Sequence, residues 1–307
     1  MSVGWVAVSV RARAMTSRRL GARGTTQLAR LGSLAEAVET LATTTYGDRV
    51  RPGQGLAEAQ HAVVDTMVWN LRVLAGWAPR EGVGILRAMV TRLEIANTLR
   101  HREALAGRPV AAAYQLGGLG TAWSRLALTK DASELRQVLA TSPWGDPGDD
   151  GTRTIGLSMQ AVAADRLVSV VPEAQEWTAG EVALLLAREL GSGRGHLPEA
   201  CRVAAARVVG WPAVSATGLA ELAAALPRQA RWALADVDRP EDLWRAEARW
   251  WSRLDHDAST LVARSMPGRA VLVGAVGLLG ADAWRVRAAL ELAARGGEAG
   301  EDADAVA

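Results

Sequence analysis

The chain has 307 residues, of which 49% are hydrophobic and 22% are charged, so it holds enough apolar material for one elongated helical body or for two or three domains. Its 35 basic and 33 acidic residues give a net charge of +2 and are interspersed along the chain, which argues against a nucleic-acid partner. All basic residues except Lys130 are arginines, and together with the abundant Ala and Gly this bias indicates GC-rich coding rather than a surface made for nucleic acid.

The amino-acid usage favours helices. Ala, Leu and Arg dominate and are good helix formers, whereas the β-branched residues Ile and Thr are sparse. Phe is absent, and twelve Trp with two Tyr supply the aromatic bulk. We therefore expect an all-α chain in which Trp replaces Phe in the core. A binding cage made by Trp250-Trp251 and the scattered tryptophans is the alternative, and exposed members could anchor a protein interface.

The N-terminal residues do not have the order of a secretory signal. An apolar run at 3–10 precedes a group of arginines, whereas a signal peptide carries its charges before the apolar run. The longest apolar stretch, 271–281, is too short and too rich in Gly to span a bilayer. The single cysteine, Cys201, excludes an intramolecular disulfide, fits a reducing compartment and is expected in the core. We expect a soluble, cytoplasmic chain that can lie beside a membrane.

The arginines that follow the apolar run form a basic stretch, namely Arg11, Arg13, Arg18 and Arg19. Such a stretch is most simply a solvated helix face. An acidic partner or lipid head groups are the alternative.

The clearest organisation in the chain is an internal repeat. Three segments, 33–48, 131–146 and 218–227, resemble one another at offsets of 98 and 87 residues. Each begins like a helix N-terminus, with Ser33, Asp131 or Gly218 as the N-cap and a Glu three residues later that can reach back to the N-cap N–H. The third segment lacks the aromatic-Gly-Asp ending of the first two.

A second anchor gives nearly the same offsets. Gly82, Gly180 and Gly268 each precede an apolar helical run, and they are 98 and 88 residues apart. Because two separate anchors agree, we interpret the chain as three copies of one helical unit.

Each unit is predicted to contain a short capped helix, a long helix and a second long helix. In the first and third copies apolar residues of the first long helix recur at steps of seven, four and seven, which lays one stripe along a helix. They are Leu56, Val63, Met67 and Leu74 in the first copy, and Leu243, Trp250, Leu254 and Leu261 in the third. The middle copy, 155–171, is apolar but lacks this spacing. The predicted units are 1–107, 108–206 and 207–296, followed by an acidic tail, 297–307, that we expect to be disordered.

A search for catalytic motifs gives weak candidates. Lys130 has no glycine-rich loop before it, so a nucleotide-binding phosphate loop is not predicted. The Gly-rich segment 191–196 follows no predicted strand, and we interpret it as a loop between helices, with a phosphate site as the alternative. Cys201 has no neighbouring base in the sequence that would make it a nucleophile.

The four histidines, His61, His101, His196 and His256, do not pair with another His or Cys at the spacing of metal ligands. The densest polar cluster is Asp255-His256-Asp257, for which a metal or acid/base role is weighed against a solvated helix face opposite Leu254 and Leu261. We therefore predict no catalytic residue, no cofactor site, no metal site and no small-molecule substrate.

Segments at the start, middle and end of the chain share the features of one known family. They are 10–14, 28–31, 33–37, Leu41 and 45–47 at the start, 93–97 in the middle, and 282–290 near the end. These segments are spread over nearly the whole chain and resemble the C subunit of V/A-type rotary ATPases, called subunit d in the vacuolar enzyme. In this alignment the acidic-apolar-Asn stretch ending at Asn97 has no good counterpart at Asp282.

The resemblance implies an all-α fold in which three helical pseudo-repeats surround a pseudo-threefold axis and form a funnel. It also implies a non-catalytic, peripheral subunit on the cytoplasmic side of the membrane. Its partners would be the central-shaft subunits and the membrane proteolipid ring of a complex that couples ATP turnover to ion (proton) transport.

Two other functions remain open at this stage. The three units could form a free helical-repeat scaffold or regulator with no ATPase partner. The chain could also be an unrecognised enzyme centred on Asp255, His256 and Asp257, which is the least favoured hypothesis.

Overall fold

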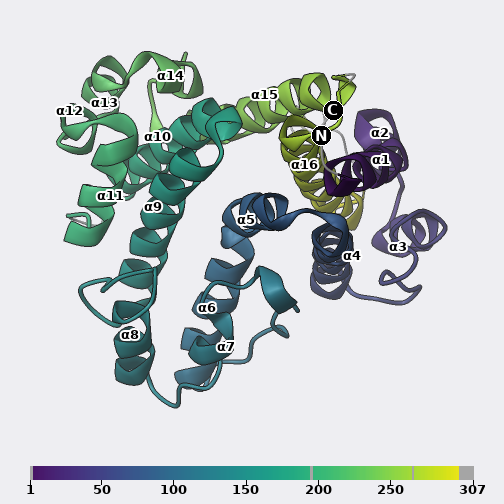
Figure 1. Cartoon of the computed structure of the whole chain (residues 1–307), viewed down its shortest axis with the longest axis horizontal. Helices are drawn as coiled ribbons and strands as arrows, with labels where there is room; N and C mark the ends of the chain where they lie inside the picture. Colours follow the sequence, from purple (N-terminus) through teal and green to yellow (C-terminus); the bar gives the residue numbers. More distant parts are fainter. Residues whose placement is uncertain (1–2, 194–195, 265, 297–307) are drawn as a thin grey trace. The chain divides into compact units, whose positions relative to one another are not determined.

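The computed structural model describes residues 3–193, 196–264 and 266–296, and within them every regular element is a helix (Figure 1). The all-α prediction is therefore confirmed for this part of the chain. The internal contacts divide the chain into two units. Unit 1 combines the first 83 residues with those from Trp251 onward, and unit 2 comprises residues 84–250.

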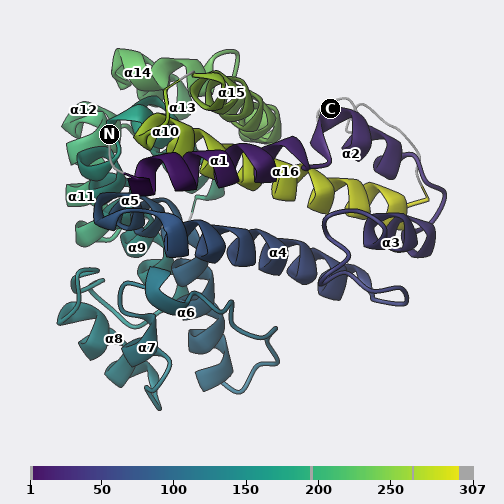
Figure 2. The same ribbon diagram turned by 45° about the vertical axis from the view of Figure 1, so that its right-hand side comes forward.

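Unit 1 is built around one long central helix. Its helices are α1 (Val3–Ser17), α2 (Gly21–Ala29), α3 (Leu34–Ala42), α4 (Leu56–Trp77) and α16 (Arg269–Ala294), and α5 (Arg80–Met89) and α15 (Leu243–Ala263) run across the boundaries of the two units. The first four helices all pack on α16, which runs beside α1 and α4 in Figure 2. The N-terminal segment thus depends on the last helix of the chain for its packing.

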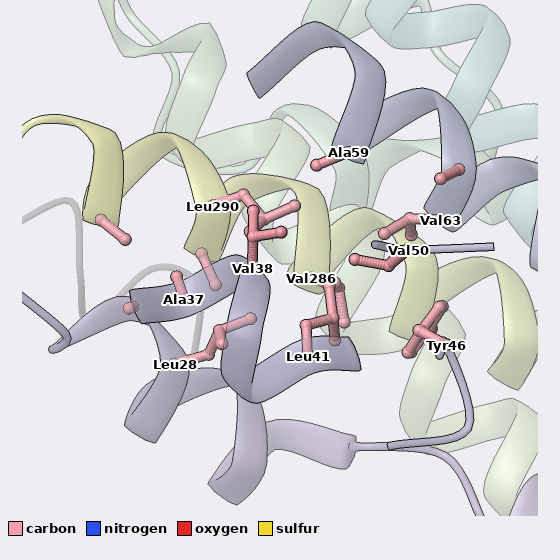
Figure 3. Packing of buried hydrophobic residues seen from close by; sticks show 14 of the residues in the cluster. Leu28, Ala37, Val38, Leu41, Tyr46, Val50, Ala59, Val63, Val286 and Leu290 are labelled. Carbon is pink, nitrogen blue, oxygen red and sulfur yellow. The ribbon is translucent and has the colours of Figure 1, made fainter. Parts of the chain in front are cut away.

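The sequence of α16 explains why it occupies the centre. Eighteen of its 26 residues are buried, and they include the nearly continuous apolar run 271–279. Figure 3 shows Leu41 and Val38 of α3 meeting Val286 and Leu290 of α16. Each fully buried side chain of this size contributes about 1.5–3 kcal/mol relative to an exposed one.

Unit 2 contains the remaining helices. They are α6 (Thr91–Leu105), α7 (Trp123–Leu126), α8 (Ala132–Ala140), α9 (Thr152–Val170), α10 (Gln175–Ser192), α11 (Glu199–Val209), α12 (Trp211–Val214), α13 (Leu219–Ala225) and α14 (Arg228–Arg231), with the 3-10 turns η1 (Gly117–Leu119), η2 (Pro172–Ala174), η3 (Trp232–Leu234) and η4 (Pro240–Asp242). α9 packs against α6, α10 and α11, while α13, α14 and η3 pack on α10. α6 also packs against α7 and α8.

The predicted N-caps are present, with one correction. The side chains of Ser33 and Asp131 each accept a hydrogen bond from the N–H three residues on, at 3.3 Å and 2.8 Å. The glutamates of the second and third copies reach one residue further back than predicted. Glu134 accepts from the N–H of Lys130 at 2.7 Å, and Glu221 accepts from the residue before its N-cap at 2.8 Å. These bonds tie the entering chain to the first turn of the helix.

Six of the eight residues in the predicted apolar stripes of the long helices are buried, and Leu56 and Met67 are partly buried. All four residues of the third-copy stripe on α15 are buried, and so are Val63 and Leu74 of the first-copy stripe on α4. The middle copy lacks the spacing because α9 is covered by α6, α10 and α11 and buries residues on several faces, from Ile155 to Ala164. A helix covered on several sides needs no single apolar stripe.

One predicted element is wrong in the first copy. The second long helix expected from Gly82 onward is divided into α5 and α6, because Val90 has φ −96° and ψ 8°, outside the helical region. The corresponding helices α10 and α16 of the other copies are continuous.

The proposed boundaries near 107 and 206 stay predictions, since the two units group residues by contact and not by repeat. The acidic tail, 297–307, lies outside the described residues.

Two glycines of α16 provide a matched test of this packing. A Cβ at Gly274 would lie 2.6 Å from the carbonyl oxygen of Ala258 and 2.8 Å from Cβ of Leu261, whereas a Cβ at Gly280 would have no atom within 4 Å. We predict that Gly274→Ala lowers the free energy of unfolding by about 1–3 kcal/mol, because α15 must move. Gly280→Ala is expected to raise it by up to ~1 kcal/mol. Chemical denaturation of both variants checks this, and equal effects would contradict the close approach of α15 to α16.

Candidate functional site

The polar cluster on α15 does not form a joint site. Asp255 pairs with Arg285 of α16 at 3.0 Å, Asp257 pairs with Arg253 at 3.5 Å, and His256 is exposed. Within the described ranges no group of three or more His, Cys, Asp or Glu side chains is placed to hold a metal ion. The structure thus separates the three candidates into two ion pairs and an exposed imidazole.

The other sequence candidates have structural surroundings. Burial raises the pKa of the Cys201 thiol to about 12, so its thiolate, the nucleophilic form, is disfavoured. Nε2 of His101 lies 2.9 Å from the hydroxyl of Thr129. His61 lies 3.6 Å from Asp65, one turn further along α4.

The Gly-rich segment 191–196 follows a helix rather than preceding one. Gly193, with φ +61°, is the C-cap of α10, and residues 194 and 195 lie outside the described part. A phosphate favours the positive N-terminal end of a helix, so the negative C-terminal end of α10 is the wrong one. Gly191 leaves room for Pro240, because a Cβ atom at position 191 would lie only 2.9 Å from Cβ of Pro240.

A buried carboxyl group organises the start of unit 1. Asp282 of α16 is 1% exposed and accepts three hydrogen bonds. The N–H groups of Leu20 and Gly21, at the start of α2, donate at 3.2 Å and 2.7 Å, and the hydroxyl of Tyr46, after α3, donates at 2.7 Å. The carboxyl group thus caps α2 and fixes the chain that leaves α3.

The same arrangement occurs in unit 2 with a different acid and a different aromatic residue. Glu94 of α6 is also 1% exposed. It accepts from the N–H of Thr121 and, at 2.7 Å, from that of Ala122, just before α7, while the indole N–H of Trp144 donates at 2.9 Å. We call the two arrangements, Asp282 with Tyr46 and Glu94 with Trp144, the carboxyl clamps.

The aromatic residues of the two clamps have the spacing of the sequence repeat. Tyr46 and Trp144 are 98 residues apart, which is the offset of the first two copies. The structural counterpart of Asp282 is Glu94 and not Asn97, whose amide instead makes a reciprocal pair of hydrogen bonds with the backbone of Tyr114 at 2.9 Å and 2.8 Å. The sequence repeat could not identify these two acids, because one is Glu and the other Asp and their helices are far apart in the sequence.

In the segment predicted to be the third copy, an indole ring packs where the other two have a carboxyl clamp. Trp232, 88 residues after Trp144, lies in η3 against Gly180 of α10, where a built Cβ would be 2.7 Å from the indole Cζ2. Its indole N–H donates to the carbonyl of Gln229 at 2.8 Å. The indole ring packs directly on α10, because Gly180, one of the three glycines used to align the sequence repeat, has no side chain there.

The tryptophans are less buried than predicted. Trp144, Trp177 and Trp250 are in the core, whereas four others are at least 40% exposed, namely Trp69, Trp77, Trp211 and Trp244. Several exposed rings lie near arginines, as in the stacking of Arg11 over Trp77 at 3.4 Å. The composition gives the number of aromatic rings, but it does not predict which of them are exposed to solvent.

A cleft of about 460 Å³ opens beside the first clamp, within unit 1. Its lining residues come from α1, α4, α16 and the chain after α1 and α3, and include Tyr46 and Asp282. Three arginines face it, Arg18, Arg19 and Arg49, of which the first two belong to the basic stretch singled out in the sequence. Nε of Arg19 is buried without a hydrogen-bond partner.

The carboxyl clamp makes stability depend on pH in the alkaline range. Burial, and then the charge and the hydrogen bond of Asp282, raise the pKa of Tyr46 well above 10.0. The unfolded chain ionises this hydroxyl near pH 10 while the folded chain does not, so the contribution of Tyr46 is complete below about pH 10 and falls above it by about 1.4 kcal/mol per pH unit.

We predict that Tyr46→Phe lowers the free energy of unfolding at pH 7 by about 1–3 kcal/mol, because the buried carboxyl group loses a donor. The variant is also expected to lose stability less steeply above pH 10. Trp144→Phe is the matched control, since it removes the equivalent donor without removing a titrating group. Unfolding measured from pH 7 to pH 11 checks this, and an unchanged alkaline slope in Tyr46→Phe would contradict it.

The ion pair between Asp255 and Arg285 predicts how substitutions of Asp255 and His256 affect stability. The guanidinium of Arg285 is 7% exposed and Asp255 is 22% exposed. We expect Asp255→Asn to lower the free energy of unfolding by about 1–3 kcal/mol, because a buried charge loses its partner, and His256→Ala to change it by less than about 0.5 kcal/mol. Thermal unfolding of both variants is the test. Two stable variants that lack an activity of the parent chain would instead favour the enzyme hypothesis.

In the described part of the chain, no helix has the length and apolar character needed to cross a bilayer.

The chain was compared with protein families and with curated proteins. No family model matches the chain, and no curated protein matches its sequence.

Proposed function

We propose that the chain is a structural coupling subunit of a V/A-type rotary ATPase, corresponding to the C subunit, or subunit d of the vacuolar enzyme. In this proposal it joins the central shaft to the membrane proteolipid ring at the cytoplasmic face of the membrane. It has no catalytic site of its own, and it transmits rotation between ATP turnover and ion (proton) transport.

The observation that carries the proposal is the way each predicted copy packs on a helix of another copy. α3 and α4 of the first copy pack on α16, and α8 and α9 of the second pack on α6. In the third, α13 packs on α10, and α15 joins α10 where the indole N–H of Trp250 donates to the carbonyl of Trp177 at 2.8 Å.

The first of these contacts favours one of two kinds of repeat protein. In a linear solenoid each copy packs only on its neighbours, and the first copy has no predecessor. Here the first copy packs on the final helix of the third. This is the connection that a closed set of three copies requires, and it supports a funnel around a pseudo-threefold axis over an open rod.

The physical demands of the role agree with these contacts. A part that passes torque needs stiff, closely packed helices and interfaces rather than a reactive group, since packed interiors have low compressibility and transmit strain. The close approach of α15 to Gly274 of α16 and the buried carboxyl clamps are features of this kind.

The alternative is a helical-repeat scaffold or regulator with no ATPase partner. It shares the all-α fold and the three copies, and it differs in its partners. Closure of the first copy on α16 does not by itself distinguish a scaffold that is also closed.

Co-purification tests the proposal. The tagged full chain, expressed in its own cell type and extracted in mild detergent, is predicted to recover a small membrane proteolipid and a coiled-coil shaft protein together. Gly274→Ala serves as a variant with loosened packing and should recover less of both. Recovery of neither by a folded parent chain would contradict the rotary assignment and leave the scaffold.

A further inference from the structure

Three arginines and two acids, Asp48 and Asp282, line the cleft beside the first carboxyl clamp, and the carboxyl group of Asp282 already accepts three hydrogen bonds. Of the described carboxyl groups, none lies within 4.0 Å of the guanidinium nitrogens of Arg18, Arg19 or Arg49. By contrast, Arg153 pairs with Glu189 at 2.5 Å and Arg136 with Asp146 at 2.8 Å in unit 2.

The two segments that carry these arginines lie side by side. The hydroxyl of Thr45 donates to the carbonyl of Arg18 at 3.3 Å, which fixes the chain after α1 against the chain after α3. Arg18 and Arg49 are exposed, while Arg19 is partly buried. The positive groups are therefore held on neighbouring segments.

The excess of positive charge belongs to unit 1 as a whole. Unit 1 contains sixteen arginines and fourteen Asp or Glu residues, four of which lie in residues 297–307, whereas unit 2 contains nineteen basic and nineteen acidic residues. Although the two kinds of charge alternate along the sequence, the fold thus collects the net charge in one unit. Such a field attracts acidic partners.

The apolar part of the cleft adds an anchor. Met15, Met67 and Leu279 line it, and the ring of Trp69 on α4 is 44% exposed. Trp and Arg are the residues that most often dominate the energy of protein interfaces, and Met adapts its shape to different partners.

We propose that this cleft is a docking site for an acidic segment of a partner protein, whose carboxylates pair with Arg18, Arg19 and Arg49 while an apolar side chain packs on Trp69. The backbone argues for such a segment over a small phosphate. The N–H groups at the start of α2, which would otherwise bind a phosphate, already donate to Asp282. The charged groups that remain are three guanidinium groups on two neighbouring segments and the exposed carboxyl group of Asp48, and their net positive charge suits several carboxylates along a chain.

The inference does not depend on the rotary-ATPase assignment, because a scaffold of another kind would offer the same cleft. The test of this inference uses the purified chain and a defined peptide. Peptide binding can therefore be absent when co-purification succeeds, and present when co-purification fails.

The probe is a fluorescein-labelled peptide of six glutamates and two leucines, titrated with the full chain and followed by fluorescence anisotropy. A peptide with serine in place of glutamate is its control. We expect saturable binding of the glutamate peptide alone, weakened by added salt.

The decisive variant carries Arg18→Gln, Arg19→Gln and Arg49→Gln together, and we expect about a tenfold loss of affinity from three partly exposed ion pairs. The matched control carries Arg23→Gln, Arg30→Gln and Arg72→Gln. These three arginines are exposed residues of unit 1 that do not line the cleft, so they remove the same charge. The control should lose less than about threefold. Trp69→Ala should lose a few-fold, and unchanged melting temperatures confirm that all variants are folded.

Three results would overturn the proposal. Equal losses in the two triple variants would show general attraction to unit 1 and not a site. No binding of the glutamate peptide, together with binding of inorganic phosphate or of vesicles containing phosphatidylserine that the first triple variant abolishes, would assign the arginines to phosphate groups. Peptide binding only after removal of residues 297–307 would assign the cleft to the acidic residues of the chain itself.

Discussion

The hydrogen bonds that converge on two buried carboxyl groups are the constraint on which the rest of the fold depends. A carboxyl group at 1% exposure is unfavourable unless its oxygens find donors, and Asp282 and Glu94 each accept two backbone N–H groups and one aromatic donor. The donors come from segments far from the acid in sequence, since Tyr46 and Asp282 are 236 residues apart. One side chain thereby fixes the start of a short helix and the chain that leaves the next one.

This constraint links the three predicted copies to the proposed role. The clamp of the first copy uses an acid from the last helix of the chain, so the N-terminal helices and α16 form one cooperative body within unit 1. The third copy reaches a related arrangement without a carboxyl group, by packing Trp232 on Gly180. The arginine cleft beside the first clamp is a separate surface, and its three arginines come from the segments after α1 and after α3, which the fold brings together.

Much of the secondary structure could be predicted from local rules. N-caps such as Asp131 and the apolar stripe from Leu243 to Leu261 depend on residues close in sequence, and the structure contains both. The break at Val90, the exposure of Trp69 and the partners of Asp255 could not be predicted, because each is decided by long-range packing. The carboxyl clamps could be predicted only in part. The aromatic residues matched at an offset of 98, but their acids lie on other helices, and only tertiary structure pairs Glu94 with Trp144.

Hydrogen exchange of single backbone amides is the most direct test of this account. The N–H groups of Gly21 and Ala122 lie at or before the first turn of short helices, where amides have no partner within the helix and ordinarily exchange fast. If the carboxyl clamps hold these segments, both amides exchange as slowly as those in the middle of α16 and α6. Exchange of Gly21 and Ala122 at the rate of exposed loop amides, while α16 and α6 stay protected, would contradict the claim that the buried carboxyl groups organise the fold.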